Sequence, residues 1–309
     1  MNASLNAIDD TSLRNVFINT SIAKAAASRL VDIHNDNLRT GTNKGFLIMG
    51  PSGVGKSVLV KKYVNSVNTE RAIEKERLPI LYLDMPSAPT KKNLGAALLK
   101  ALDDPYANMN SESAEAKFSR VVKLLDSLSV ELVILDEAQH LVDYKRGDAY
   151  EAGDWIKSLI NNSKVSVVLV GMTRLEGLKR VNAQFRRRFS ASYTLMRFRP
   201  GGEFWPEFAG VIKAMQKVMV VDSVSLVTDE MINRFYFASF GLLDYLVKIL
   251  ERAVCLVRIG RFDGVNLAVL DMAFKDEVWQ LAPGNRSPFN KEFDFRPLVG
   301  PDEPYEKIE

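Results

Sequence analysis

A glycine-rich segment at residues 50–57 follows a short apolar run and precedes a stretch with helical periodicity. Its spacing is G-x-x-x-x-G-K-[ST], which lets backbone N–H groups turn inward around phosphate oxygens. A helix that begins near Lys56 directs its positive dipole end toward the same place. The segment therefore predicts a strand, a phosphate-binding loop and a helix in that order, formed by Gly50, Pro51, Ser52, Gly53, Val54, Gly55, Lys56 and Ser57.

Short apolar runs alternate with longer helical patterns over residues 45–200. The runs lie at 45–49, 79–84, 131–136, 165–170 and 192–196, and the helical patterns at 56–67, 94–102, 114–128 and 150–161. Mostly apolar runs of this length are typical of strands buried on both faces of a parallel sheet. The alternation predicts an α/β fold in which helices sandwich a five-stranded parallel sheet.

The composition along the chain divides it into four parts. Residues 1–44 form an N-terminal helical segment, and residues 45–200 form the nucleotide-binding α/β core. After the Pro-Gly-Gly sequence that begins at Pro200, residues 201–280 carry only helical patterns, which predicts a small all-helical lid domain. Residues 281–309 are rich in proline and acidic side chains, so we expect a tail that either docks on the protein or stays loose.

Composition excludes several classes of protein. One cysteine excludes an internal disulfide framework, and two histidines leave little material for a histidine-based metal site. There is no apolar run long enough to span a membrane and no visible secretory signal, so we expect a cytoplasmic protein without membrane contact. The formal net charge is only +3, so any binding to nucleic acid must come from local patches.

The chemistry expected at the phosphate loop is that of ATP and Mg²⁺. Lys56 supplies a cation for the β- and γ-phosphates, and Ser57 supplies an oxygen ligand for Mg²⁺. The third apolar run ends in Asp136 and Glu137, which would lie at the sheet edge where such folds bind ligands. There Asp136 would hold Mg²⁺ through water and Glu137 would polarise the attacking water. An ordinary strand end with a solvated helix start explains the same pair.

Three further features follow these strands. Gly171, Met172 and Thr173 follow the fourth run at the end of that strand, and Thr173 is a candidate for sensing the γ-phosphate by a hydrogen bond. His140 reads as a polar residue at a helix start rather than as a catalytic or metal-binding group. Residues 179–199 contain seven basic residues and no acidic one, which fits an arginine finger supplied in trans or a contact to a phosphate backbone.

Together these features resemble the AAA+ ATPases, and their spacing over about residues 15–260 resembles the TniB/TnsC family. That family comprises ATP-dependent regulators of transposition in Tn-type elements and CRISPR-associated transposons. Residues 182–189 resemble its Asn-x-Gln-Leu-x-x-Arg-Phe sequence, which identifies Arg188 as the finger with Arg187 as the alternative. One departure is Asp244, which stands where AAA+ lids often carry a second sensor arginine. Lys248, one turn later, is left unassigned.

The resemblance implies an ATP-driven oligomer, a hexameric ring or helical filament, on duplex DNA. Such an assembly would connect a target-selection protein to a transposase. Family members contact DNA after the second strand, which in this chain places Thr90, Lys91 and Lys92 at the DNA. A solvated helix start explains these three residues equally well, and Lys145 with Arg146 is a second candidate pair.

Two other functions remain open from the sequence. One is a helicase loader or replication initiator, which shares the ATP site and the preference for DNA. The other is a nucleotide-gated interaction or secretion ATPase that has no role on DNA and so predicts no salt-sensitive DNA binding.

Overall fold

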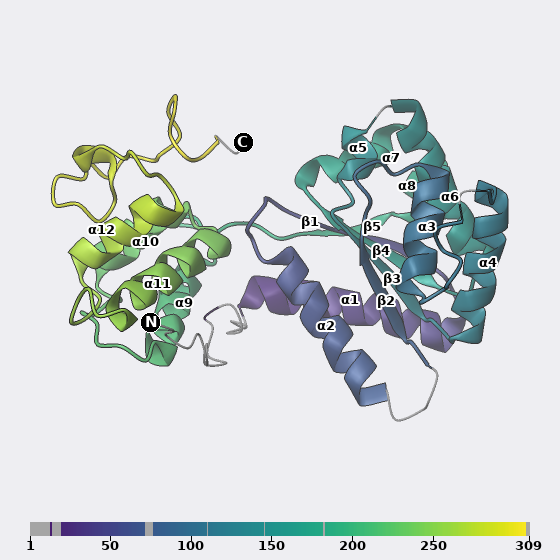
Figure 1. Cartoon of the computed structure of the whole chain (residues 1–309), viewed down its shortest axis with the longest axis horizontal. Helices are drawn as coiled ribbons and strands as arrows, with labels where there is room; N and C mark the ends of the chain where they lie inside the picture. The colour runs from purple at the N-terminus through teal and green to yellow at the C-terminus, as the bar shows by residue number, and fades with distance from the viewer. Residues whose placement is uncertain are drawn as a thin grey trace, which may run out of the picture. The chain divides into compact units, whose positions relative to one another are not determined.

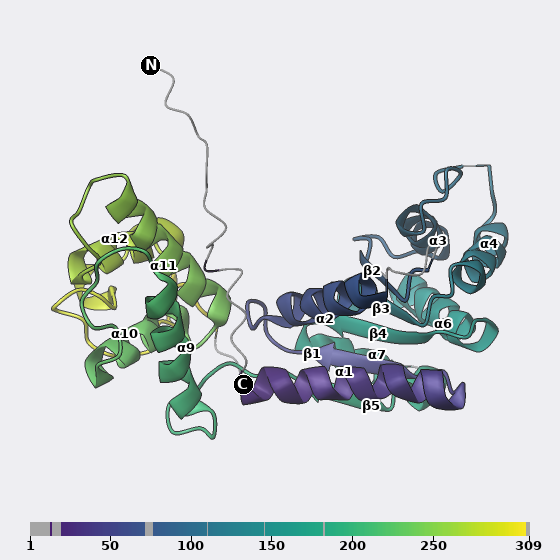
Figure 2. The same cartoon turned by 90° about the horizontal axis from the view of Figure 1, so that it is seen from below.

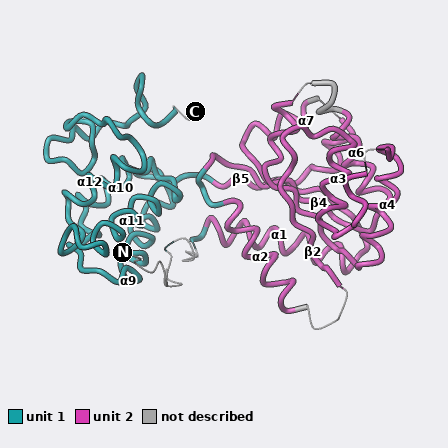
Figure 3. The backbone as a smooth tube through the Cα atoms, viewed as in Figure 1, with its two compact units in different colours: residues 1–21, 53–55, 196–309 teal, residues 22–52, 56–195 magenta. Residues whose placement is uncertain are grey.

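The computed structural model describes residue 13 and residues 20–71, 77–109, 111–144, 146–181 and 183–306, except for the side chains of residues 71, 146–150 and 181 (Figure 1). The chain forms two compact units (Figure 3). One unit comprises Met1–Ser21, Gly53–Gly55 and Met196–Glu309, and the other comprises Ile22–Ser52 and Lys56–Leu195.

The larger unit is built on a five-stranded sheet with the order β2-β3-β4-β1-β5. Every pairing in it is parallel, as the apolar runs of the sequence predicted. The register places Asp84 opposite Asp136 at the carboxyl ends of β2 and β3. The strands are β1 (Gly45–Met49), β2 (Ile80–Asp84), β3 (Leu132–Asp136), β4 (Ser166–Gly171) and β5 (Ala191–Thr194).

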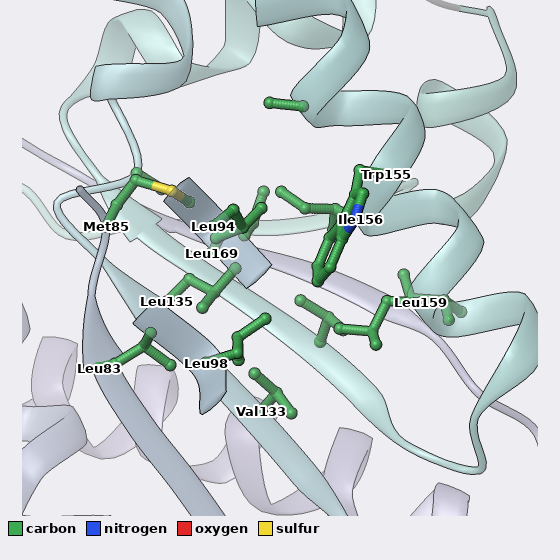
Figure 4. Close-up of a cluster of buried hydrophobic side chains, with 14 of the residues drawn as sticks. Leu83, Met85, Leu94, Leu98, Val133, Leu135, Trp155, Ile156, Leu159 and Leu169 are labelled. Carbon is green, nitrogen blue, oxygen red and sulfur yellow. The ribbon is translucent and has the colours of Figure 1, made fainter. Parts of the chain in front are cut away.

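Helices cover both faces of this sheet (Figures 1 and 2). One face carries α1 (Ser21–Thr40) and α2 (Lys56–Arg71). The other carries α3 (Lys91–Ala101), α4 (Ala114–Ser127), α6 (Arg146–Asn162) and α8 (Ala183–Arg188). Alternate strand residues such as Val133 and Leu135 pack with Leu98 and Ile156 in a buried cluster under this second group (Figure 4). The sandwiched parallel sheet predicted from the sequence is therefore confirmed.

Short helices that the sequence patterns did not predict follow the third and fourth strands. They are α5 (His140–Asp143), the 3₁₀ helix η2 (Thr173–Glu176) and α7 (Gly177–Val181). Each has only four or five residues, too few for a 3.6-residue periodicity to be visible in the sequence.

The regular elements of the smaller unit, over the residues that the structure describes, are helices, with one isolated β-bridge between Ser223 and Val265. Its helices are α9 (Trp205–Val218), α10 (Asp229–Ser239), α11 (Leu243–Arg258) and α12 (Leu267–Glu277), followed by the 3₁₀ helix η3 (Gly284–Arg286). The four longer helices all lie within residues 201–280, the part of the chain that carries only helical patterns, which confirms a C-terminal helical region. None of the described helices combines the length and the apolar character needed to cross a bilayer.

The segment after α12 packs against the helices of the same unit. Arg286 is 7% exposed, and its guanidinium donates to Asp294 and to the backbone carbonyl of Pro297. The guanidinium of Arg234, from α10, donates to the carbonyls of Pro288 and Asn290 at 2.6 and 2.8 Å. Buried charged groups need such partners. Of the two behaviours expected for the tail, docking is therefore the one the described residues adopt.

Tyr305 holds the end of this segment against α10 and the residue that follows it. Its ring stacks on Phe240 with centroids 5.2 Å apart, and its hydroxyl donates to the carbonyl of Ala238. We expect Tyr305→Phe to lower the free energy of unfolding by about 1–2 kcal/mol, because a buried carbonyl loses its donor. Tyr245→Phe, which changes a neighbouring tyrosine, is the control. Urea unfolding measures both variants, and a Tyr305→Phe protein as stable as wild type would contradict this contact.

Candidate nucleotide site

The loops after β1, β3 and β4 meet at one edge of the sheet, because β4 lies between β3 and β1. The Gly50 amide donates to the carbonyl of Gly171 at 3.2 Å, and the Ala138 amide donates to the carbonyl of Val170 at 2.8 Å. These backbone bonds fix the starts of the three loops relative to one another. In open parallel sheets, this edge is where ligands bind.

The phosphate loop has the backbone that its sequence requires. Gly53 and Gly55 adopt φ values of +76° and +99°, a region that favours glycine. Helix α2 begins at Lys56, and its first turn contains no acidic residue. The N–H groups of that turn and the helix dipole therefore favour an anion at the loop.

Lys56 is held beneath the loop. The residue is 9% exposed, and its ammonium group donates to the carbonyls of Gly50 and Pro51 at 3.0 and 2.8 Å. Burial lowers the pKa of Lys56, and the carboxylates of Asp136 and Glu137 partly offset this effect by favouring the charged form. The structure thus brings Lys56 into electrostatic range of both acids that the sequence singled out.

Asp136 is the more buried of these acids, with 1% exposure. Its Oδ1 accepts from the Glu137 amide at 2.8 Å, and its Oδ2 accepts from the hydroxyl of Tyr82 at 2.8 Å. The same hydroxyl lies 3.0 Å from Oδ1 of Asp84. Burial is the main cause that raises the pKa of Tyr82, so the hydroxyl keeps its proton and acts as a donor.

Sequence reasoning missed Tyr82. The available signal was a tyrosine in the otherwise apolar run that ends at Asp84, where its hydroxyl needed a polar partner. The register of β2 and β3 supplies that partner in Asp136. A carboxylate oriented in this way beside a buried lysine, together with Ser57 in the first turn of α2, is a donor set that fits a hydrated Mg²⁺ and a nucleotide phosphate.

Glu137 stands at the end of β3 with an unusual backbone. Its φ is +53°, the left-handed region that few non-glycine residues adopt. The side chain is exposed, and its carboxylate accepts from the side-chain amide of Gln139. Gln139 was not among the site residues predicted from the sequence, and nothing in the spacing indicated this bond.

Four other residues that the sequence singled out lie on three different helices. Thr173 is exposed and is the first residue of η2, which follows β4 after Met172. His140 is the first residue of α5, a helix start as expected. Within the smaller unit, Asp244, which stands where a second sensor arginine is often found, forms an ion pair with Lys248 at 2.7 Å.

Helix α8 presents three consecutive arginines. Phe185 and Phe189 are buried and stack with centroids 4.2 Å apart, which fixes the apolar side of the segment. Arg186, Arg187 and Arg188 are exposed, and none of the three forms an ion pair with a carboxylate of the described residues. The guanidinium groups are therefore accessible to an anion supplied by another molecule.

The residues expected at DNA occupy two places in the larger unit. Thr90 is the N-cap of α3, and its hydroxyl accepts from the Asn93 amide at 3.2 Å. Lys91 lies 3.3 Å from the exposed carboxylate of Glu151, and Lys92 is the next residue of the helix. Lys145 and the side chain of Arg146 lie outside the described residues.

Solved structures share this architecture. The Aeropyrum pernix ORC2 protein, solved as ADPNP and ADP complexes, matches with a TM-score of 0.67 and 16% identity over 89% of this chain and 73% of its own. The Aeropyrum pernix ORC1 protein in complex with DNA matches with a TM-score of 0.65 and 15% identity, over 86% and 69% of the two chains. Domain III of the Thermotoga maritima replication initiation protein DnaA matches with a TM-score of 0.54 and 16% identity, over 87% and 97%. At these identities the likeness concerns the fold.

A family model places the sequence more closely. No curated protein sequence is significantly similar to the chain. The model described as "Bacterial TniB protein" matches residues 11–199, which is more than half of the chain and includes the phosphate loop, Asp136, Glu137 and α8. The chain belongs to the TniB family of AAA+ ATPases.

Proposed function

We propose that the site hydrolyses ATP with these residues in distinct roles. Lys56 neutralises β- and γ-phosphate oxygens, and Ser57 and Asp136 hold Mg²⁺, which when bound would neutralise charge on the same phosphates. Glu137 orients and polarises the attacking water as a general base. Thr173 contacts the γ-phosphate, and Arg188 reaches the nucleotide of a neighbouring subunit. The observation that supports this assignment is the convergence of Lys56, Asp136 and Glu137 at one sheet edge.

We propose further that the protein is an ATP-dependent regulator of DNA transposition. It would oligomerise on duplex DNA as a hexameric ring or helical filament and connect a target-selection protein to the transposase. Membership of the TniB family supports this role, and so does the exposed arginine row of α8, which suits an anionic partner from another molecule. The ORC1 protein of similar fold was solved with DNA, which supports DNA as one such partner.

Stimulation of ATP turnover by DNA tests this function. A finger supplied in trans makes the site complete only in an assembly, so duplex DNA that promotes assembly should raise the turnover per subunit. Turnover that is indifferent to DNA at low salt would instead favour a nucleotide-gated interaction or secretion ATPase. A helicase loader or replication initiator is the alternative that the ORC and DnaA likenesses favour, and it would require a helicase as partner.

Lys91 and Lys92 carry a separate prediction about DNA contact. If both neutralise DNA phosphates, Lys91→Ala with Lys92→Ala should weaken binding to every duplex sequence alike. The slope of log K against log salt should fall by about 0.9 per lost contact, or roughly two units per subunit. Fluorescence anisotropy across a salt series measures this slope.

The matched control for that pair is Lys100→Ala with Lys123→Ala, which removes two exposed lysines from α3 and α4. An unchanged slope in the Lys91 and Lys92 variant would leave these residues as a solvated helix start, with Lys91 paired to Glu151. Lys145 and Arg146 would then be the remaining candidates for the contact to DNA.

The four-part division of the chain is part of the same proposal. Residues 1–44 would be the N-terminal helical segment, 45–200 the nucleotide-binding core, 201–280 the lid and 281–309 the tail. We also propose that the protein acts in the cytoplasm, where ATP and the DNA of the transposable element are found.

A further inference from the structure

Gln139 joins two parts of the nucleotide site through its side-chain amide. The amide nitrogen donates to Oε2 of Glu137, and the amide oxygen accepts from the backbone N–H of Met172 at 3.1 Å. Met172 follows β4 and caps η2, which begins at Thr173. One buried amide therefore links the carboxylate after β3 to the backbone after β4.

Burial and backbone contacts restrict the position of the Gln139 side chain. Gln139 is 5% exposed, and its backbone carbonyl accepts from the Val142 amide at 2.8 Å. A Cβ placed on Gly171 would lie 2.7 Å from the Gln139 amide oxygen and 3.0 Å from its backbone nitrogen. Only glycine leaves room for the amide at that point, so β4 ends in a residue that allows Gln139 to reach Met172.

Glu137 depends on this amide because its backbone alone does not fix its carboxylate. The residue holds a φ of +53° and its side chain is exposed, so several rotamers are open to it. Among the described residues, the side-chain hydrogen bond to this carboxylate comes from the amide of Gln139. A general base must lie within hydrogen-bond reach of the water it activates, so the direction of the carboxylate determines the rate.

We propose that Gln139 is a positioning residue that directs the Glu137 carboxylate and makes its direction follow the backbone at Met172. This inference rests on the proposed role of Glu137 in hydrolysis. A movement of the segment that carries Thr173 would be transmitted to the base through the two ends of one amide. Gln139 does not itself touch the reacting atoms.

Two substitutions separate the two ends of the amide. Gln139→Met keeps the length of the side chain and removes both bonds. Gln139→Glu keeps an oxygen acceptor for the Met172 N–H and replaces the donor to Glu137 with a second negative charge. Gln280→Met, which changes an exposed glutamine of the other unit, is the matched control.

Both Gln139 variants should lower kcat about tenfold or more, the worth of one hydrogen bond to a charged group. Nucleotide affinity, measured with a fluorescent analogue, should stay within about twofold of wild type, since Gln139 acts on the base and not on the phosphates. A wild-type rate in Gln139→Glu, with a slow Gln139→Met, would overturn the proposal, because only the Met172 bond would then matter.

Hydrogen–deuterium exchange in the nucleotide-free protein gives a readout that does not depend on turnover. The Met172 amide should exchange about fivefold faster in Gln139→Met and close to the wild-type rate in Gln139→Glu. Equal exchange in wild type and Gln139→Met would overturn the link to Met172. If Gln139→Met does not fold, Gln139→Glu alone still tests the effect on kcat.

A double variant distinguishes failure of this inference from failure of the proposed function. Glu137→Gln combined with Gln139→Met should keep the residual rate of Glu137→Gln alone, because Gln139 acts only through Glu137. A further tenfold loss would overturn the positioning role. If both Gln139 variants hydrolyse at the wild-type rate while Glu137→Gln is inactive, this inference fails and the role of Glu137 stands. If Glu137→Gln itself hydrolyses at the wild-type rate, the proposed function fails.

Discussion

Arg188→Ala should bind ATP normally as a monomer yet hydrolyse it about 10³-fold or more slowly on DNA, roughly the value that arginine fingers supply. Guanidinium is planar, permanently charged and able to bridge γ-phosphate oxygens as charge develops. In the structure Arg188 ends α8 and is exposed, with Phe185 and Phe189 buried behind it. Its place after β4 suits the nucleotide of a neighbouring subunit.

A mixing experiment decides whether Arg188 acts in trans. Arg188→Ala and Lys56→Ala should each be inactive alone, but one interface in a mixed oligomer pairs an intact phosphate loop with an intact finger. Some activity should therefore return, provided that labelling of each variant shows mixed assembly. Arg186→Ala, a neighbouring exposed arginine, is the matched control. If mixed oligomers form without activity at any ratio, while Arg187→Ala alone abolishes hydrolysis, the finger is Arg187.

Glu137→Gln should retain ATP binding and lose turnover by at least about 10²-fold. The amide keeps the shape of the side chain and lacks the base that orients water. Nucleotide affinity and turnover should be measured side by side in the same preparation, with the exposed Glu176→Gln as control. Turnover at the wild-type rate in Glu137→Gln would remove this residue from the chemistry.

The sheet and the long helices could be predicted from the sequence because their patterns are long enough to read. Apolar runs such as residues 132–136 are buried on both faces, and the helices from Trp205 to Glu277 show a clear apolar periodicity. The phosphate loop was predictable for another reason, since its glycines and Lys56 must follow a fixed spacing. The short helices α5, α7 and η2 left no such pattern.

The supporting residues of the site could not be predicted from the sequence, because they act through contacts between strands that lie far apart along the chain. Tyr82 reaches Asp136 only because β2 and β3 pair in one register, and the sequence does not state that register. Gln139 reaches Met172 only because β4 lies beside β3 and ends at Gly171. The tail is similar, since Arg286 finds Asp294 and Glu303 only after the chain has folded back.

Electron microscopy of the protein with duplex DNA tests the central claim, ATP-dependent assembly on DNA, most directly. Samples with ATP, with a non-hydrolysable analogue and without nucleotide should be compared, each with and without DNA. Rings or filaments on DNA in the presence of either nucleotide, most persistent with the analogue, are the predicted result. Isolated monomers under every condition would contradict the claim.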